Sequence, residues 1–326
     1  MPAETKRMSE KNRVSKEGFV KTQAGYLLFR FGTSVARCLP VTSLNFVGEE
    51  LGILSFYLSG RWRKTALRNL NMEFGKEKEK EEILRIRREV FKHIGKNMVE
   101  ACRLNDFGQS HLKRLARFKG KEHLDNALKG GKGVIGLSCH LGNFPLMVAR
   151  LAVEDYPLSL VAKDPDNPKM AKAITSARDA FGMESIPDEP RLACVSRCFK
   201  SLKENRVLLL QIDQNAPITE AWVDFFGCLV PTFKGPVLFS IRTGAPILPM
   251  FISRDSSHLH QITIHPPFDL DVSGQTEQDV TSNTARLTKI IEGAIREHPE
   301  QWLWHYRRFK RARDIQTGER IFRKHP

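Results

Sequence analysis

The sequence predicts an α/β fold in which a largely parallel central sheet is flanked by helices. From residue 130 onward, short unbroken apolar runs alternate with helix-length amphipathic stretches. That alternation is typical of strands buried on both faces and joined by crossover helices. Glycines at 182 and 244 follow two of the helix-length stretches, where glycine often ends a helix. The chain has 326 residues, 41% of them hydrophobic, which is enough to bury a sizeable core.

The elements are expected in a fixed order. The predicted strands are 134–138, 158–162, 206–212, 222–226, 246–252 and 261–265, and the helices among them are 144–154, 168–181, 191–204, 235–243 and 279–297. Before these, 61–70 predicts a basic helix and the charged run 76–82 a solvated turn that opens a long helix to about residue 104. Apolar residues at helical spacing predict one buried face on that long helix: Ile83, Ile86, Val90, Ile94 and Met98.

Four segments are predicted: a polar basic N-terminal tail (1–22), a membrane-associated helical segment (23–60), an α/β domain (61–310) and a basic C-terminal tail (311–326). Charged residues through Lys21 indicate no cleavable signal peptide. The apolar stretch 26–58 is interrupted by charges and a proline, so no run reaches the roughly 18–20 residues of a membrane span. We expect two helices in the membrane interface or a shallow hairpin; the alternative is a pair of core helices.

The charge balance predicts anionic partners. Lys and Arg number 52 and Asp and Glu 37, so the net charge is +15. Nucleic acid, a membrane surface, a phosphorylated lipid and an acidic protein all fit such a charge. Basic residues gather at 61–68 and at 307–311, and the second group follows aromatic residues from Trp302, a mixture that suits nucleic-acid stacking or a membrane interface.

The six cysteines contain no C-x-x-C pair. We expect reduced thiols without a disulfide framework or a zinc site, as in a protein that faces the cytosol.

His140 directly follows the first strand of the predicted central sheet. Ligands bind beyond the carboxyl ends of strands in open α/β sheets, so this position suits a general base. A structural histidine is the alternative. Cys139 is expected to point the other way, into the core, because neighbours on an extended segment face opposite sides. This makes a cysteine nucleophile the weaker hypothesis. Asn143 can cap the following helix, whose first turn tolerates Pro145.

A second polar cluster, Asp213-Gln214-Asn215, follows the strand 206–212 and is expected on the same edge of the sheet. A turn with helix caps is the alternative for this cluster. Further blocks come later in the chain: Phe225-Phe226-Gly227, Lys234 within 231–236, Arg242-Thr243-Gly244-Ala245-Pro246, and Pro299-Glu300-Gln301-Trp302-Leu303-Trp304.

Taken in order with Arg68-Asn69-Leu70, these blocks resemble the bacterial lipid A biosynthesis lauroyl/myristoyl acyltransferases, a branch of the lysophospholipid acyltransferase superfamily. The resemblance covers roughly 26–310 and implies a glycerolipid acyltransferase-like fold at the cytoplasmic face of the inner membrane. It implies acyl transfer from an acyl carrier protein thioester to a hydroxyl of an anionic glycolipid, with His140 as the base. It implies no metal and no organic cofactor.

The resemblance also marks expected site residues. We expect His140 and Asp213 to be catalytic, and the substrate-binding positions to be Asn143, Lys163, Gln214, Asn215, Phe225, Phe226, Gly227, Lys234 and Arg242. Two positions depart from the family pattern. The family places Asp or Glu after four residues beyond its histidine, where this chain has Pro145. Lys163 stands where many members have Arg, which loses the planar two-pronged contact of a guanidinium.

Three explanations for Pro145 remain open. Asp213 can supply the missing carboxylate, which we prefer; His140 can act alone; or the chain can be a catalytically weak lipid-binding relative. Other readings keep the fold but change the acceptor to a phospholipid, a mannoside or an ornithine lipid. A nucleic-acid-binding protein is the distant alternative and is not expected, because the basic residues are spread along the chain and no nucleic-acid module appears.

Overall fold

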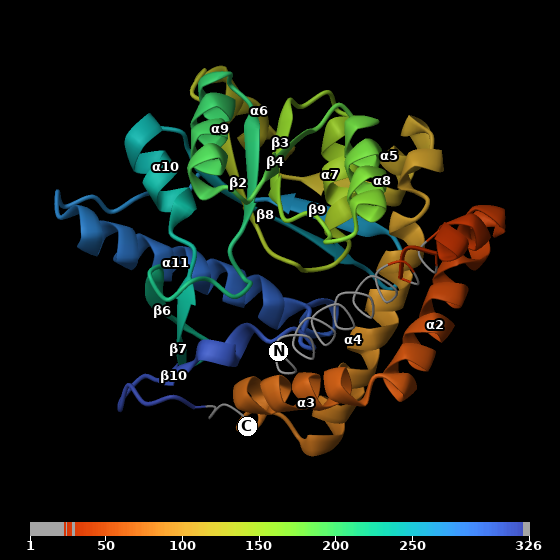
Figure 1. The fold of residues 1–326 in the computed structure, drawn as a ribbon. Coiled ribbons are helices and arrows are strands. Elements are labelled where there is room, and N and C mark those ends of the chain that lie inside the picture. Colours follow the sequence, from red (N-terminus) through yellow and green to blue (C-terminus); the bar gives the residue numbers. More distant parts are fainter. Residues whose placement is uncertain (1–22, 24, 28–29, 322–326) are drawn as a thin grey trace, which may run out of the picture.

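A seven-stranded sheet forms the centre of the computed structural model, which describes residues 23, 25–27 and 30–321 (Figure 1). Its strand order is β1-β9-β8-β2-β5-β3-β4. Every neighbouring pair is parallel except β8 and β9, which confirms the largely parallel sheet. The strands are β1 (Ala116–Lys119), β2 (Val134–Ser138), β3 (Leu158–Ala162), β4 (Glu184–Pro187), β5 (Val207–Gln211), β8 (Ile247–Arg254) and β9 (His260–Ile264).

Helices cover both faces of this sheet. One face packs against α9 (Arg191–Lys203), α10 (Gly235–Thr243) and α11 (Thr276–Glu297), and the other against α5 (Gln109–Leu115), α6 (Lys121–Lys129) and α7 (Phe144–Ala152). All five residues of β2 are buried, because this strand lies between the two hydrophobic cores. The crossover helix α8 (Pro168–Asp179) joins β3 to β4. The apolar runs of the sequence therefore mark the strands that are covered on both sides.

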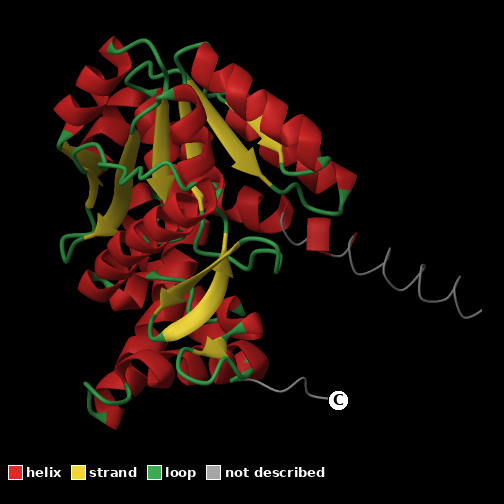
Figure 2. Ribbon diagram, turned by 90° about the vertical axis from the view of Figure 1, so that its left-hand side faces the viewer, coloured by secondary structure: helices red, strands yellow, loops and turns green. Residues whose placement is uncertain are grey.

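A small antiparallel sheet lies beside the main one and is visible below it in Figure 2. It contains β6 (Ala221–Phe225), β7 (Cys228–Thr232) and β10 (Arg313–Asp314). The β6–β7 hairpin turns at Phe226 and Gly227, both of which have positive φ. Only β6 was expected from the sequence, since Pro231 interrupts the strand pattern of β7. The strand β10 falls within the predicted C-terminal tail, so part of that tail is paired with β7.

Two further helices, α3 (Gly60–Phe74) and α4 (Lys80–Ala101), extend from one side of the main sheet together with α2 (Leu44–Leu58). The interface of α2 with α4 is formed by glycines, because a Cβ on Gly95 would lie 2.0 Å from the backbone oxygen of Gly48. The opposite side of α2 exposes large apolar residues, namely Phe46, Leu51, Leu54, Tyr57 and Leu58. Within the described ranges, no helix is both long and apolar enough to cross a bilayer.

The long helix α4 departs from the sequence expectation at one end. Ile83, Ile86 and Val90 are buried as predicted, but Met98 is 64% exposed. Its side chain lines a large cavity instead of the hydrophobic core. The apolar stripe therefore continues past the core because the last turns of α4 form a wall of that cavity.

The glycine contact between α2 and α4 generates a stability prediction. We expect Gly95→Ala to lower the free energy of unfolding by about 1–3 kcal/mol, because its Cβ would overlap the backbone of α2. Gly293→Ala on α11 is the matched control, since no atom lies within 4 Å of its added Cβ. That change should raise stability by up to about 1 kcal/mol through helix propensity. Denaturant unfolding measures the free energy of unfolding of both variants. If Gly95→Ala were stabilised as much as Gly293→Ala, the close packing of α2 on α4 would be contradicted.

Candidate active site

The two predicted catalytic residues meet at the carboxyl edge of the sheet. Strands β2 and β5 are parallel neighbours, and Ser138 is paired with Gln211. His140 and Asp213 each lie two residues beyond that pair, so the two loops leave the sheet side by side. The Nδ1 atom of His140 is 2.8 Å from Oδ1 of Asp213. The geometry is that of a carboxylate which orients an imidazole, supplied by Asp213 where position 145 has proline.

The carboxylate of Asp213 is buried and fully hydrogen-bonded. Besides the imidazole, the backbone N–H of His140 donates to Oδ2 at 2.9 Å. The indole Nε1–H of Trp302 donates to the same oxygen at 2.8 Å. Asp213 thus fixes both the backbone and the side chain of His140. The contact with Trp302 could not be expected from local sequence patterns, because Trp302 lies 89 positions further along the chain.

Burial and pairing act in opposite directions on this pair. Burial lowers the pKa of His140, but the charge and the hydrogen bond of Asp213 outweigh it and hold the pKa above its ordinary value of 6.5. Burial raises the pKa of Asp213, whereas the charge and hydrogen bond of His140, together with the bond from Trp302, bring it below its usual range. Asp213 therefore stays ionised at neutral pH and supports the protonated form of His140.

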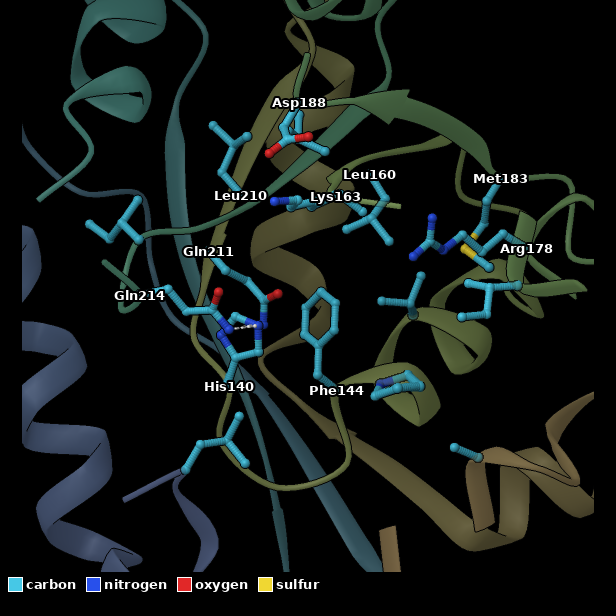
Figure 3. Close-up of a pocket in the computed structure, with 18 of the residues that line it drawn as sticks. His140, Phe144, Leu160, Lys163, Arg178, Met183, Asp188, Leu210, Gln211 and Gln214 are labelled. Atoms are coloured by element: carbon cyan, nitrogen blue, oxygen red, sulfur yellow. Dashed lines mark hydrogen bonds between the residues drawn. The ribbon is translucent and has the colours of Figure 1, made fainter. Parts of the chain in front are cut away.

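The second imidazole nitrogen faces the cavity. With Nδ1–H donating to Asp213, Nε2 of His140 is the acceptor, and Nε2 of Gln214 lies 3.0 Å from it. Figure 3 shows the Gln214 amide reaching across the ring. Any ligand that donates a hydrogen bond to Nε2 would need the same lone pair and would have to displace the Gln214 amide.

The loop after His140 is held by close backbone contacts. Gly142 has φ +58, and a Cβ there would lie 2.2 Å from the backbone oxygen of Ile252. Its N–H donates to the carbonyl of Gln301 and its carbonyl accepts from Asn97 at 2.8 Å. Only glycine fits this position, which places the loop firmly on β8.

A buried ion pair lies under the same loop. Arg254 forms two hydrogen bonds of 2.6 Å with Glu100, and His260 lies 3.2 Å from the same carboxylate. Although burial opposes ionisation, these bonds from His260 and Arg254 lower the pKa of Glu100 to about 2. Glu100 also accepts a bond from Asn143, whose own Oδ1 caps α7 at the N–H of Leu146.

A cavity of about 1450 Å³ opens onto His140. It contains five of the predicted substrate-binding residues: Lys163, Gln214, Asn215, Lys234 and Arg242. Figure 3 shows Phe144 between His140 and Arg178, with Lys163 above them, so the cavity extends well beyond the histidine. Most of the remaining wall is apolar and comes from α7, α8, α9, α10 and β3.

Four other predicted substrate-binding residues are placed differently. Asn143 lies against this cavity but its side chain is fully buried and engaged with Glu100 and Leu146, which argues against a contact with substrate. Phe225 and Phe226 are buried beneath Trp302 and do not line the cavity, nor does Gly227 in their hairpin turn. These three residues therefore do not form the cavity wall; Phe225 and Phe226 pack against the tryptophan that holds Asp213.

The aromatic and basic C-terminal segment is also internal. Trp302, Trp304, Arg308 and Phe309 are all buried. The guanidinium of Arg308 donates to the carbonyls of Gln214 and Pro231 at 2.8 and 2.7 Å, and burial lowers its pKa to about 10. An exposed stacking surface at 302–309 was therefore not found, and Arg308 cannot belong to an exposed basic cluster.

The cysteines do not form a site of their own. Cys139 is buried as predicted, and burial together with the charge of Asp213 raises the pKa of its thiol. A thiolate nucleophile at this position is thus disfavoured. In the portion of the chain that is described, no three His, Cys, Asp or Glu side chains are grouped as metal ligands.

Comparisons with known proteins show which family this chain resembles. The family model for bacterial lipid A biosynthesis acyltransferases matches residues 15–311. The lipid A biosynthesis lauroyltransferase of Escherichia coli is 23% identical over 275 residues, covering 83% of this chain and 87% of that protein. The corresponding palmitoleoyltransferase is 24% identical over 275 residues, 83% of this chain and 86% of its own length.

A second group of relatives is named differently. The phosphatidylinositol mannoside acyltransferase of Mycobacterium tuberculosis is 26% identical over 187 residues. That match covers 56% of this chain and 56% of the mycobacterial protein, so the chain spans little more than half the length of this relative.

The opposing effects on His140 generate a titration prediction. Asp213→Asn removes the charge that raises the pKa of His140 but leaves the burial that lowers it. We therefore expect the pKa of His140 to fall below 6.5 in this variant. NMR titration of isotope-labelled histidine measures the change, with the exposed Asp269→Asn as the control. An unchanged pKa in Asp213→Asn would contradict the coupling.

Proposed function

Because the chain belongs to the bacterial lipid A biosynthesis acyltransferase family, we propose that it moves a fatty acyl chain from an acyl carrier protein thioester to a hydroxyl of a lipid A precursor or related glycolipid. The observation that carries this proposal is the His140–Asp213 pair at the cavity, in which Nδ1 of the imidazole lies against the carboxylate and Nε2 faces Gln214 on the other side. An O-acyltransferase of this family needs such a base, and no other histidine lines the cavity within the described ranges.

The proposed reaction begins when an acceptor hydroxyl displaces the Gln214 amide from Nε2 of His140. The imidazole then takes the hydroxyl proton while the oxygen attacks the thioester carbonyl carbon. Asp213 stabilises the imidazolium that forms and holds its orientation through Nδ1–H. A carboxylate at position 145 is unnecessary in this scheme, because Asp213 reaches the imidazole from the neighbouring strand.

The charge around the cavity supports anionic substrates. Cations on its wall outnumber acids: Arg30, Arg37, Lys163, Arg178, Arg191, Lys234 and Arg242 face only Asp188, Glu189 and Glu220. Phosphates of a glycolipid head group and an acidic carrier protein would both be attracted to this rim. The net charge of +15 extends the same attraction over the whole molecule.

The apolar walls support a lipid substrate. No residue of α8 is buried, and its apolar residues Ala173, Ile174 and Ala177 face the cavity. Amphipathic helices usually bury their apolar stripe against the core. The apolar stripe of α8 faces the open cavity instead, where an apolar ligand could cover it. An acyl chain would be such a ligand, and the cavity exceeds the roughly 300–1,000 Å³ typical of small-molecule pockets.

The comparison with the mycobacterial relatives favours a second acceptor. Those proteins are named phosphatidylinositol mannoside acyltransferases, so a mannose-bearing phospholipid is an alternative source of the hydroxyl. The chemistry at His140 would be the same, and only the head group beyond the reacting hydroxyl would differ.

We further propose that the protein lies on the cytoplasmic face of the inner membrane. The exposed apolar side chains concentrate at one end of the described chain: Leu27, Phe31, Val35, Val41, Phe46, Leu51, Leu54, Tyr57, Leu58 and Trp62. Basic residues Arg61 and Lys64 lie next to them on α3. A surface with these two properties suits the boundary between head groups and acyl chains of an anionic membrane.

An acyl-transfer assay tests the proposed function. Dodecanoyl-acyl carrier protein and a lipid A precursor in vesicles serve as substrates. We expect His140→Ala and Asp213→Asn each to lower turnover by roughly 10²–10⁴-fold, because the first removes the base and the second its orientation. The remaining Asp213→Asn activity should extend to lower pH, since the base stays neutral there.

Several outcomes would contradict parts of this proposal. Near wild-type turnover in Asp213→Asn, with none in His140→Ala, would remove the role of Asp213. Full activity in His140→Ala would contradict the role of His140 as the base. Mass spectrometry of lipid A from cells with and without the protein tests the acceptor, and an unchanged acyl pattern would exclude lipid A. The vesicle assay with a mannose-bearing phospholipid then examines the alternative.

Vesicle sedimentation tests the membrane surface. We expect Leu54→Gln combined with Leu58→Gln to weaken binding to phosphatidylglycerol vesicles by at least about tenfold, because two exposed leucines lose their apolar contact. Leu192→Gln is the matched control, since Leu192 is 86% exposed on α9, away from this surface. If the control weakens binding as much as the double variant, α2 is not the membrane surface.

A further inference from the structure

We propose that Gln211 is a catalytic residue that donates a hydrogen bond from its amide Nε2 to the thioester carbonyl oxygen, where negative charge develops during acyl transfer. This inference rests on the proposed function and names the group that stabilises the oxyanion. Gln211 was absent from the residues expected from the sequence, where it only interrupts an apolar run.

Its place in the sheet brings Gln211 to the base. It is the last residue of β5 and is paired with Ser138, two residues before His140. Side chains alternate along a strand, so Gln211 points to the same face as Leu209, towards the core that contains α7. Gln211 lines the cavity that opens onto His140, and Figure 3 shows its amide extending towards the imidazole.

The amide nitrogen of Gln211 has no partner in the described protein. Its Nε2 is buried and forms no hydrogen bond. Leaving a buried donor unsatisfied is destabilising, and a ligand oxygen at this point would supply the missing acceptor. The neighbouring Gln214 differs, because its Nε2 is already bound to His140. A free donor beside the base is the arrangement that acyl transfer requires.

Two other residues of the same cavity have a buried polar atom without a hydrogen bond, although Nη1 of Arg178 is ion-paired with Asp164 at 3.6 Å, and neither atom fits this role. The Oδ1 atom of Asn215 can only accept a hydrogen bond. The Nη1 atom of Arg178 belongs to the end of α8, on the far side of Phe144 from His140 in Figure 3. Gln211 is therefore the donor whose position matches the reacting carbonyl.

Three backbone donors near the base are already bonded. The N–H groups of His140, Gly142 and Leu146 bond to Asp213, Gln301 and Asn143. Pro145 has no N–H at all. Enzymes often use backbone N–H groups at a helix start as oxyanion donors, but the first turn of α7 has lost two of them. The side-chain amide of Gln211 adds an unbonded donor beside these groups.

The step can be written in full. As the hydroxyl oxygen bonds to the carbonyl carbon, His140 Nε2 takes the hydroxyl proton and the carbonyl π electrons move onto oxygen. Gln211 Nε2–H donates to that oxyanion. When the electrons return, the carbon–sulfur bond breaks, the thiolate takes the proton from His140, and the products are an ester and a thiol.

The test uses the full-length protein and the dodecanoyl-acyl carrier protein assay, together with thiol release when water is the acceptor. Gln211→Met keeps the length of the side chain but removes the donor. We expect kcat to fall by roughly 10²–10³-fold in both reactions, the effect of losing one oxyanion donor. KM for the acyl carrier substrate and the acid limb of the pH profile should remain unchanged, because the contact between His140 and Asp213 is intact. The exposed Gln278→Met is the matched control.

Gln211→Asn retains an amide that is one methylene shorter and should restore part of the activity lost in Gln211→Met. A kcat within about threefold of wild type in Gln211→Met would overturn the role of Gln211 and leave the proposed function standing. A shifted acid limb, or an Asn variant as impaired as Met, would show that Gln211 acts structurally and would overturn the role too. Absence of transfer and thiol release in the wild-type protein would overturn both proposals.

Discussion

The site depends on the buried carboxylate of Asp213. Three donors converge on it: the imidazole and the backbone N–H of His140, and the indole of Trp302. Each donor depends on a different part of the fold. The pairing of β2 with β5 brings in the imidazole, the turn after β2 brings in the backbone N–H, and the return of the C-terminal segment brings in the indole. A buried charge is tolerated only when it is paired and hydrogen-bonded, so the position of this carboxylate requires all three elements to be in place.

The C-terminal segment explains why aromatic residues surround a polar site. Trp302 lies on Phe225 and Phe226, and Leu141 forms an isolated antiparallel bridge with it. Arg308 joins the backbone of Gln214 to that of Pro231, so the loop after β5 is fastened to the small sheet. The small sheet and α11 thus support the loop that carries Asp213, whereas much of the apolar cavity wall comes from α4, α7, α8, α9 and α10.

Most of the central fold could be predicted because its strands are buried on both faces. The apolar runs at β2 and β3 gave the observed bounds. The edge strands β1 and β4 were missed, since half-exposed strands carry mixed residues that no period identifies. The proximity of Asp213 to His140 followed from parallel strand ends, which is a local rule. Trp302 and Gln211 could not be identified in this way, because their importance comes from contacts that form only in the folded chain. For a related reason, the sequence did not show that Phe225 and Phe226 lie in the core and not at the cavity wall, because aromatic side chains suit both places equally.

The contact between the Trp302 indole and Asp213 also has a consequence for the order in which the site forms during synthesis. A ribosome makes the chain from its amino end, so β2, β5 and their loops emerge long before residue 302. Until the C-terminal segment folds back, Asp213 lacks one of its donors and the imidazole is incompletely held. During synthesis, the pair of His140 and Asp213 would therefore be fully held only after Trp302 has left the ribosome and its segment has folded back.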